Sequence, residues 1–200
     1  IIMSFAYGLA IYLMVLAAAY AWTGRDLGDL VMQRLRTLLA VFVAAALYFV
    51  VVHHMTSMYF TKYHAVEAFI LRDGGIYTTL FWVGQILIGC VIPLVILLSG
   101  MGKSRTWIMI ACALVVAGGL MQMYVTIIGA QAWPLDLFPG MLQKSSYFDG
   151  EIHSYAPSTP EIFLGLGGVA IALLVTTFAV KVLRLLPVSL DDATVAKLEH

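Results

Sequence analysis

The chain has 200 residues, of which 62% are hydrophobic and 11% are charged, and its mean hydropathy is +0.96. These values lie far above those of a soluble domain and indicate that lipid surrounds much of the chain. The 11 basic residues balance the 11 acidic ones, so the net charge gives no sign of a nucleic-acid partner. We therefore expect an integral membrane protein with the lipid bilayer as its environment.

Five stretches are long and apolar enough to cross a bilayer as helices. A hydrocarbon core about 30 Å thick requires about 20 mostly apolar residues per helix. The pattern predicts an all-α, polytopic transmembrane bundle over residues 1–183, followed by a cytoplasmic tail at 184–200. Pro93 lies inside the third stretch and should bend that helix, because proline cannot donate a backbone hydrogen bond. The predicted spans are 1–22, 37–60, 76–100, 106–130 and 161–183.

Lysine and arginine predict which side of the membrane each connection faces. Eight of the 11 lie in three places: residues 23–36, the turn after the third span, and the end of the last span with the tail. The positive-inside rule assigns these three places to the cytoplasm. The connections 61–75 and 131–160 are then extracytoplasmic. Aromatic residues lie mostly toward the span ends, as expected of headgroup anchors: Trp22, Tyr48, Tyr59, Tyr77, Trp82, Trp107 and Tyr124.

The polar residues inside the spans are few. Gln85 and Gln122 are expected to form hydrogen bonds between helices, and Gly118 and Gly119 offer small surfaces for close helix packing. The two cysteines, Cys90 and Cys112, lie in apolar runs without a metal-binding spacing, so we expect buried small side chains and no intrinsic metal site.

The chain ends carry little weight in this interpretation. The first residue is isoleucine and no signal-like segment precedes the first span, so we expect further sequence before it. Leu198, Glu199 and His200 are either native or left from a tag.

Polar chemistry concentrates in residues 53–75, which read HHMTSMYFTKYHAVEAFILRDGG. The segment from residue 64 suits a short interfacial helix that ends at the paired glycines. We single out six candidate site residues here, as quinone-side or partner-side redox groups: His53, His54, Tyr59, His64, Glu67 and Asp73.

Three interpretations of these residues stay open. In the first, His53 or His54 is an axial ligand of a haem. In the second, the residues form a structural polar cap in which Glu67 and Asp73 pair with Arg72 or Lys62. In the third, the segment is a redox face, because histidine, tyrosine and carboxylate can handle the protons that a quinone headgroup exchanges.

The connection 131–160 is long and rich in proline, with four prolines and two glycines in residues 134–160. Loops of this length without secondary structure are usually functional or disordered, and aromatic content argues against disorder. We expect an ordered partner-binding surface. Ser158 to Glu161 predicts the start of the last helix. The expected partner-binding residues are Trp133, Phe138, Tyr147, Phe148 and Tyr155.

Three segments of the chain resemble a known family: YHAVEAFILRDGGIYTTLFWVGQILIGCVIPL, MYVTIIGAQAWPLDLFPG and SYAPSTPEIFLGLGGVAIALL. Together they are similar to the C-terminal half of NrfD-like membrane subunits, the polysulfide-reductase type. Within that family they are most similar to the DsrP branch, which belongs to sulfite-reductase-associated Dsr complexes of sulfur metabolism. The resemblance covers most of residues 37–183.

The resemblance implies a protein of eight to ten spans in a bacterial or archaeal cytoplasmic membrane, of which this chain is half. Such a subunit holds no prosthetic group and passes electrons between the quinone pool, menaquinone or ubiquinone, and an extracytoplasmic iron–sulfur, ferredoxin-like subunit. A multihaem cytochrome and other membrane subunits are further expected partners. The six candidate residues would lie near the iron–sulfur partner, while the family's quinone pocket is generally built on its first helix bundle.

Other functions remain possible from the sequence. One is a b-type haem-binding membrane anchor, and another is a purely structural anchor without a quinone site. A third is half of a transporter, which the absence of charged residues from the middle of the spans disfavours.

Overall fold

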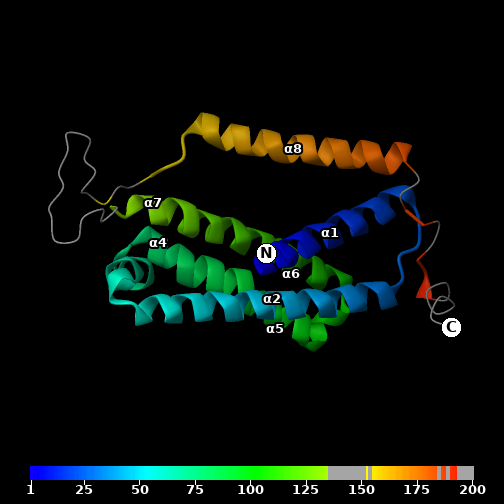
Figure 1. The fold of residues 1–200 in the computed structure, drawn as a ribbon. Coiled ribbons are helices and arrows are strands. Elements are labelled where there is room, and N and C mark those ends of the chain that lie inside the picture. The colour runs from blue at the N-terminus through cyan, green and yellow to red at the C-terminus, as the bar shows by residue number, and fades with distance from the viewer. Residues whose placement is uncertain (135–151, 153–154, 184–185, 188–189, 193–200) are drawn as a thin grey trace. The chain divides into compact units, whose positions relative to one another are not determined.

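The computed structural model describes residues 1–134, 152, 155–183, 186–187 and 190–192. Within these residues the regular secondary structure is helical, apart from one isolated bridge between Leu27 and Leu190, and short irregular connections join the helices. Five helices are long and apolar enough to cross a membrane, which confirms the all-α, multi-pass prediction (Figure 1). They are α1 (Ile2–Thr23), α2 (Asp29–Tyr59), the helix Ile76–Leu98, the helix Arg105–Ala132, and α8 (Thr159–Val182).

Helix α2 begins eight residues earlier than the hydropathy of the span predicts. Asp29 lies in its first turn, where a carboxylate interacts favourably with the helix dipole. The helix has 31 residues, about 46 Å at 1.5 Å per residue, which exceeds a hydrocarbon core of about 30 Å. Its ends therefore extend beyond the apolar stretch between Arg36 and His53.

The third and fourth spans change helix type along their length. The third consists of α4 (Ile76–Thr79), the π-helix η3 (Leu80–Val91) and α5 (Ile92–Leu98). The fourth consists of α6 (Arg105–Met123), the π-helix η5 (Tyr124–Gly129) and α7 (Ala130–Ala132). Pro93 is in the first turn of α5, so the irregularity expected at this proline takes the form of a transition between helix types.

The third and fourth spans cross at a pair of glycines. A methyl group on Gly89 would lie 2.7 Å from Cα of Gly118, and one on Gly118 would in turn overlap Gly89. The next glycine, Gly119, faces the ring of Tyr7 from α1. The close packing predicted for Gly118 and Gly119 is therefore confirmed, and only glycine fits at the crossing.

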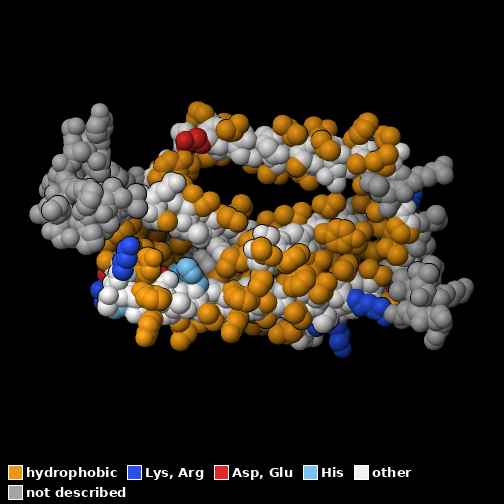
Figure 2. Space-filling model, viewed as in Figure 1, with side chains coloured by type: hydrophobic (Ala, Val, Ile, Leu, Met, Phe, Trp, Pro, Cys, Tyr) orange, Lys and Arg blue, Asp and Glu red, His pale blue; other side chains and the backbone are white. Residues whose placement is uncertain are grey.

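The chain forms two compact units. The first contains Ile1–Val15 and Met32–His153 and carries the buried glutamines and cysteines. In it the Tyr7 hydroxyl donates to Oε1 of Gln122, which confirms an interhelical role for Gln122. Cys90 and Cys112 are free and buried, as predicted. Hydrophobic side chains cover the spans, while Lys and Arg gather toward their ends (Figure 2).

The second unit contains Leu16–Val31 and Ser154–His200. Ser158 precedes α8, and its backbone N–H donates to the carboxylate of Glu161 at 2.7 Å, which confirms the predicted helix start. The Lys181 ammonium lies 4.6 Å from the centroid of the Trp22 ring. Arg25 donates through Nη1 to the carbonyl of Leu186 at 2.8 Å.

Candidate functional site

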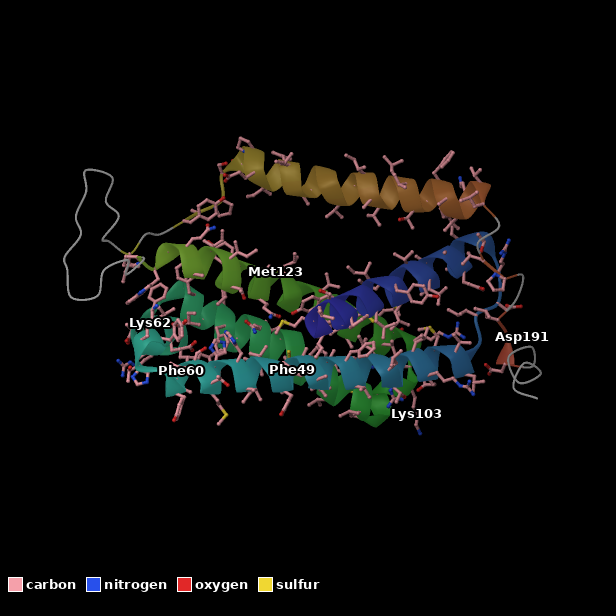
Figure 3. The ribbon with its side chains drawn as sticks, in the orientation of Figure 1. Phe49, Phe60, Lys62, Lys103, Met123 and Asp191 are labelled. Atoms are coloured by element: carbon pink, nitrogen blue, oxygen red, sulfur yellow. The ribbon has the colours of Figure 1, made fainter. Side chains whose placement is uncertain are left out.

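The site is built where α2 ends and the chain turns back toward the third span. The connection is helical throughout: η1 (Thr61–Tyr63) is a 3₁₀ turn, α3 (His64–Ala68) is an α-helix and η2 (Phe69–Asp73) is a π-helix. Gly75 then adopts φ of +57°, a conformation that favours glycine, so the predicted glycine turn is confirmed. Figure 3 shows Phe60 and Lys62 at this end of the first unit and Lys103 at the other.

The centre of the site is a contact between His54 and Glu67. Nδ1 of His54, on α2, lies 2.7 Å from Oε2 of Glu67, on α3, and the two side chains are 15% and 7% exposed. The His54 ring also packs edge-on against Phe81 of η3, with centroids 4.7 Å apart. With a proton on Nδ1 the imidazole donates to the carboxylate, which then holds the ring in position. Three helices thus enclose an acid–base pair.

This pairing bears on the polar-cap interpretation, one of the three left open from the sequence. In that interpretation Glu67 would pair with Arg72 or Lys62, whereas in the structure it contacts His54. The physical reason is that Glu67 lies on the inward face of the connection, whereas Arg72 is exposed and already bound to Asp73. A carboxylate buried away from water requires a polar partner, and the imidazole of His54 is that partner here.

The other predicted ion pair is confirmed. Arg72 donates to Asp73 through Nε at 2.9 Å and through Nη2 at 3.0 Å. The hydrogen bond from Arg72 lowers the pKa of Asp73, and the same bond raises the pKa of Arg72. Both side chains are exposed to solvent, so the pair contributes little to stability.

The remaining candidates stay outside the buried pair. His53 is exposed, and its ring lies edge-on to that of His54 with centroids 5.3 Å apart. His64 is exposed and donates through Nε2 to the carbonyl of Met58 at 2.5 Å. Tyr59 is 84% exposed. The structure therefore brings two of the six candidates together, with His53 beside them.

An aromatic cluster adjoins the site at the ends of the third and fourth spans. Phe69 lies 5.6 Å from Tyr77 and 5.3 Å from Trp133, and Tyr77 stacks on Tyr124 at 6.0 Å between ring centroids. Tyr77 was expected to anchor in the headgroup region and is instead 4% exposed. We call Phe69, Tyr77, Tyr124 and Trp133 the aromatic cluster.

The hydroxyl of Tyr77 is buried and has no hydrogen-bond partner among the described residues. Leaving a buried hydroxyl unsatisfied is unfavourable by about 1–3 kcal/mol. Such a group in a native fold calls for an explanation. One explanation is that a polar atom of another molecule forms the missing hydrogen bond.

Two residues of this region could not have been found from the sequence. Phe81 and Tyr77 carry no polar pattern or spacing that separates them from the other aromatic residues of the spans. Their roles follow from the fold, because the glycine turn at Gly74 and Gly75 brings the start of the third span against the end of α2 and its connection.

The expected partner surface is described only in part. Trp133 is half-buried in the aromatic cluster, and the Tyr155 hydroxyl donates to Glu161 at 2.8 Å. Phe138, Tyr147 and Phe148 lie outside the described residues. The role of the connection 131–160 in partner binding stays a prediction.

No group of three or more metal-ligating side chains occurs within the part of the chain that the structure describes. His53 and His54 are the haem-ligand candidates taken from the sequence; Nδ1 of His54 is engaged by Glu67, which leaves Nε2 as the nitrogen of that ring that could bind a metal. The arrangement suits proton exchange, in which the imidazole gains and loses a proton beside a fixed carboxylate.

A comparison with protein families gives one match. The family described as "Polysulphide reductase, NrfD" matches residues 1–134, which is two thirds of the chain. The matched segment contains the first four spans, the His54–Glu67 pair and the aromatic cluster. No curated protein and no solved structure matched the chain.

Proposed function

Because the chain belongs to the NrfD family of polysulphide-reductase membrane subunits, we propose that it passes electrons between the quinone pool and an iron–sulfur subunit outside the membrane. In this proposal the iron–sulfur partner docks on the connections 61–75 and 131–160. These two connections carry fewer lysine and arginine residues than the connections and the tail on the other side of the membrane, which supports an extracytoplasmic location.

The observation that carries the proposal is the buried contact between His54 and Glu67. Oxidation of a quinol releases two electrons and two protons, so a protein that accepts the electrons needs a nearby proton acceptor. Histidine changes its charge closest to neutral pH, and a carboxylate beside it stabilises the protonated ring. The pair lies where α2 leaves its apolar stretch, and we propose that a quinone headgroup exchanges its protons there.

The finer assignment follows the sequence resemblance. We place the chain closest to the DsrP branch, with a multihaem cytochrome and further membrane subunits as partners in a sulfur-metabolising complex. Quinone contacts on another helix bundle of the complex are compatible with the proposal, since the His54–Glu67 pair then serves proton exchange next to the electron path. The quinone is an exchangeable substrate in this scheme.

The test is quinol-driven reduction of the partner's iron–sulfur clusters in the intact, membrane-extracted complex. Glu67→Gln keeps the size of the side chain and removes its charge, so we expect the rate to fall by a factor of about 100, typical of a lost general base. His54→Gln should act similarly. The readout is stopped-flow absorbance of the clusters after addition of a short-chain quinol.

Lys103→Gln is the control, because Lys103 is exposed at the other end of the first unit, away from the buried pair and outside the proposed docking connections. Its rate should equal that of the wild type. Equal rates for Glu67→Gln and the wild type would assign the pair to structure alone.

The same preparation separates the alternative functions. A Soret band that belongs to this subunit would favour the haem anchor. Wild-type complex that assembles fully and never accepts electrons from quinol would favour the structural anchor.

A further inference from the structure

The His54–Glu67 pair needs a route by which protons reach water. Glu67 is 6% exposed, and the side chain of His54 is 15% exposed, so the pair itself meets little solvent. A proton that the pair accepts must be passed on before the next turnover. The exposed residue whose ring contacts the pair is His53, which lies against the ring of His54.

The three side chains form a sequence of rising exposure. Glu67 is the innermost, His54 lies between, and His53 is exposed on α2. The carboxylate and the first imidazole are 2.7 Å apart, and the two imidazole rings meet edge to face with centroids 5.3 Å apart. The two rings are direct neighbours, and one bridging water can complete a proton transfer between their nitrogens.

Beyond His53, α2 carries two hydroxyl side chains beside the exposed apolar side chains of Met55 and Met58. Thr56 and Ser57 follow at three and four residues along α2, so they lie above His53 on the same side of the helix. Before His53 the helix is apolar back to Arg36, apart from the hydroxyls of Thr37 and Tyr48. His53 therefore stands where polar side chains first follow the apolar stretch of α2.

Other titratable groups near the pair are less suited to this role. His64 of α3 is bound to the Met58 carbonyl, and Arg72 and Asp73 of η2 are bound to each other. Helix η3 presents Phe81, which does not titrate, and Lys62 of η1 is exposed without a contact to the pair among the described residues.

We propose that His53 is the proton exit of the His54–Glu67 pair, carrying protons from the buried site to the water at the membrane surface. The proposal rests on the proposed quinol-linked function. For each quinol oxidised, two electrons pass to the partner's clusters and two protons pass, one at a time, to His54, then to His53, and then to buffer. The quinone leaves with two protons fewer, and each histidine returns to its starting state.

The test uses the intact complex and compares His53→Ala with Lys103→Ala, an exposed residue at the other end of the first unit that is not in the sequence of transfers. Quinol-driven cluster reduction is measured in dilute buffer and again with added imidazole, which can enter the space that His53 leaves. We expect His53→Ala to lose at least about tenfold in rate in dilute buffer, and imidazole to restore most of it. The rates of the wild type and of Lys103→Ala should be equal in dilute buffer and should not change when imidazole is added.

Every outcome is informative. If His53→Ala transfers electrons at the wild-type rate in dilute buffer, the exit role is wrong while the proposed function stands. If the loss is not restored by imidazole, His53 acts through structure and the proposal is equally wrong. A wild-type complex without quinol-driven reduction overturns the proposed function and the proton exit together. His53→Gln is the second variant if His53→Ala does not assemble.

Discussion

The two ends of α2 bury polar side chains in different ways. One end, which we call the Arg36 end, contains Arg36 and Gln33 of α2, Leu97 of α5, and Gly102 and Lys103 of η4 (Gly100–Lys103). The other, the His54 end, contains the His54–Glu67 pair and His53. Both belong to the first unit, and the 18 residue steps from Arg36 to His54 correspond to about 27 Å along the helix.

At the Arg36 end the side chains bind to backbone carbonyls and to each other. Arg36 donates through Nε to the carbonyl of Leu97 at 2.5 Å and through Nη1 to Gln33 at 2.6 Å. Gln33 donates in turn to the carbonyls of Gly102 at 3.3 Å and Lys103 at 3.2 Å. A guanidinium keeps its charge at any physiological pH, so this end is a fixed clamp that closes the C-terminus of α5.

At the His54 end both partners can change protonation state. The imidazole and the carboxylate contact each other, and an exposed second imidazole lies beside them. The comparison teaches that burial of polar groups at a helix end does not by itself indicate function. What distinguishes the two ends is the chemistry of the groups: a guanidinium on backbone carbonyls at one end, and an imidazole on a carboxylate at the other.

The largest effect on stability is expected from Arg36→Met, which removes the clamp at the Arg36 end and leaves the His54 end unchanged. The variant leaves the Leu97 carbonyl without its charged donor, so the free energy of unfolding should fall by about 2 kcal/mol. Electron transfer per assembled complex should stay at the wild-type rate. Thermal unfolding in detergent and the cluster-reduction assay measure the two quantities. Slower electron transfer in the assembled variant would contradict the view that the Arg36 end contributes only to stability.

A smaller effect distinguishes two tyrosines, the half-buried Tyr7 and the buried Tyr77. Tyr7→Phe removes the hydroxyl that binds Gln122, so we expect a loss of about 1 kcal/mol in unfolding free energy. Tyr77→Phe removes a hydroxyl that has no partner among the described residues, so stability should be unchanged or slightly higher. Thermal unfolding of both variants gives the comparison. A destabilised or slower Tyr77→Phe would show that the hydroxyl finds a partner in the complete complex.

The smallest effect is expected from Asp73→Asn, although Asp73 is one of the candidates taken from the sequence. Arg72 lowers the pKa of Asp73, so any stability from the pair is present above the ordinary aspartate pKa and is lost as pH falls through the lowered value. Because both side chains are exposed, solvent screens the pair, and the melting temperature should match the wild type between about pH 5 and 8. A pH-dependent difference in that range would show that the pair is buried by a partner.

Much of the fold could be predicted because membrane spans follow from local sequence. Backbone groups inside lipid must be satisfied within the helix, so a long apolar run is a helix wherever it packs. The five spans, the helix start at Ser158 and the turn at Gly75 were all predictable on such local grounds. The early start of α2 was not, because its first turns are polar and lie beyond the apolar stretch.

The candidate site was predictable as a region and not as a set of contacts. The sequence by itself determined that acid, histidine and tyrosine concentrate in residues 53–75, because lipid excludes them from the spans. Only the tertiary structure decided that Glu67 meets His54 and leaves Arg72 to Asp73, and that Tyr77 is buried. The reason is physical: the direction of each side chain depends on how the connection folds back against α2 and on the change from α to π geometry at Phe69, which residue spacing alone does not specify.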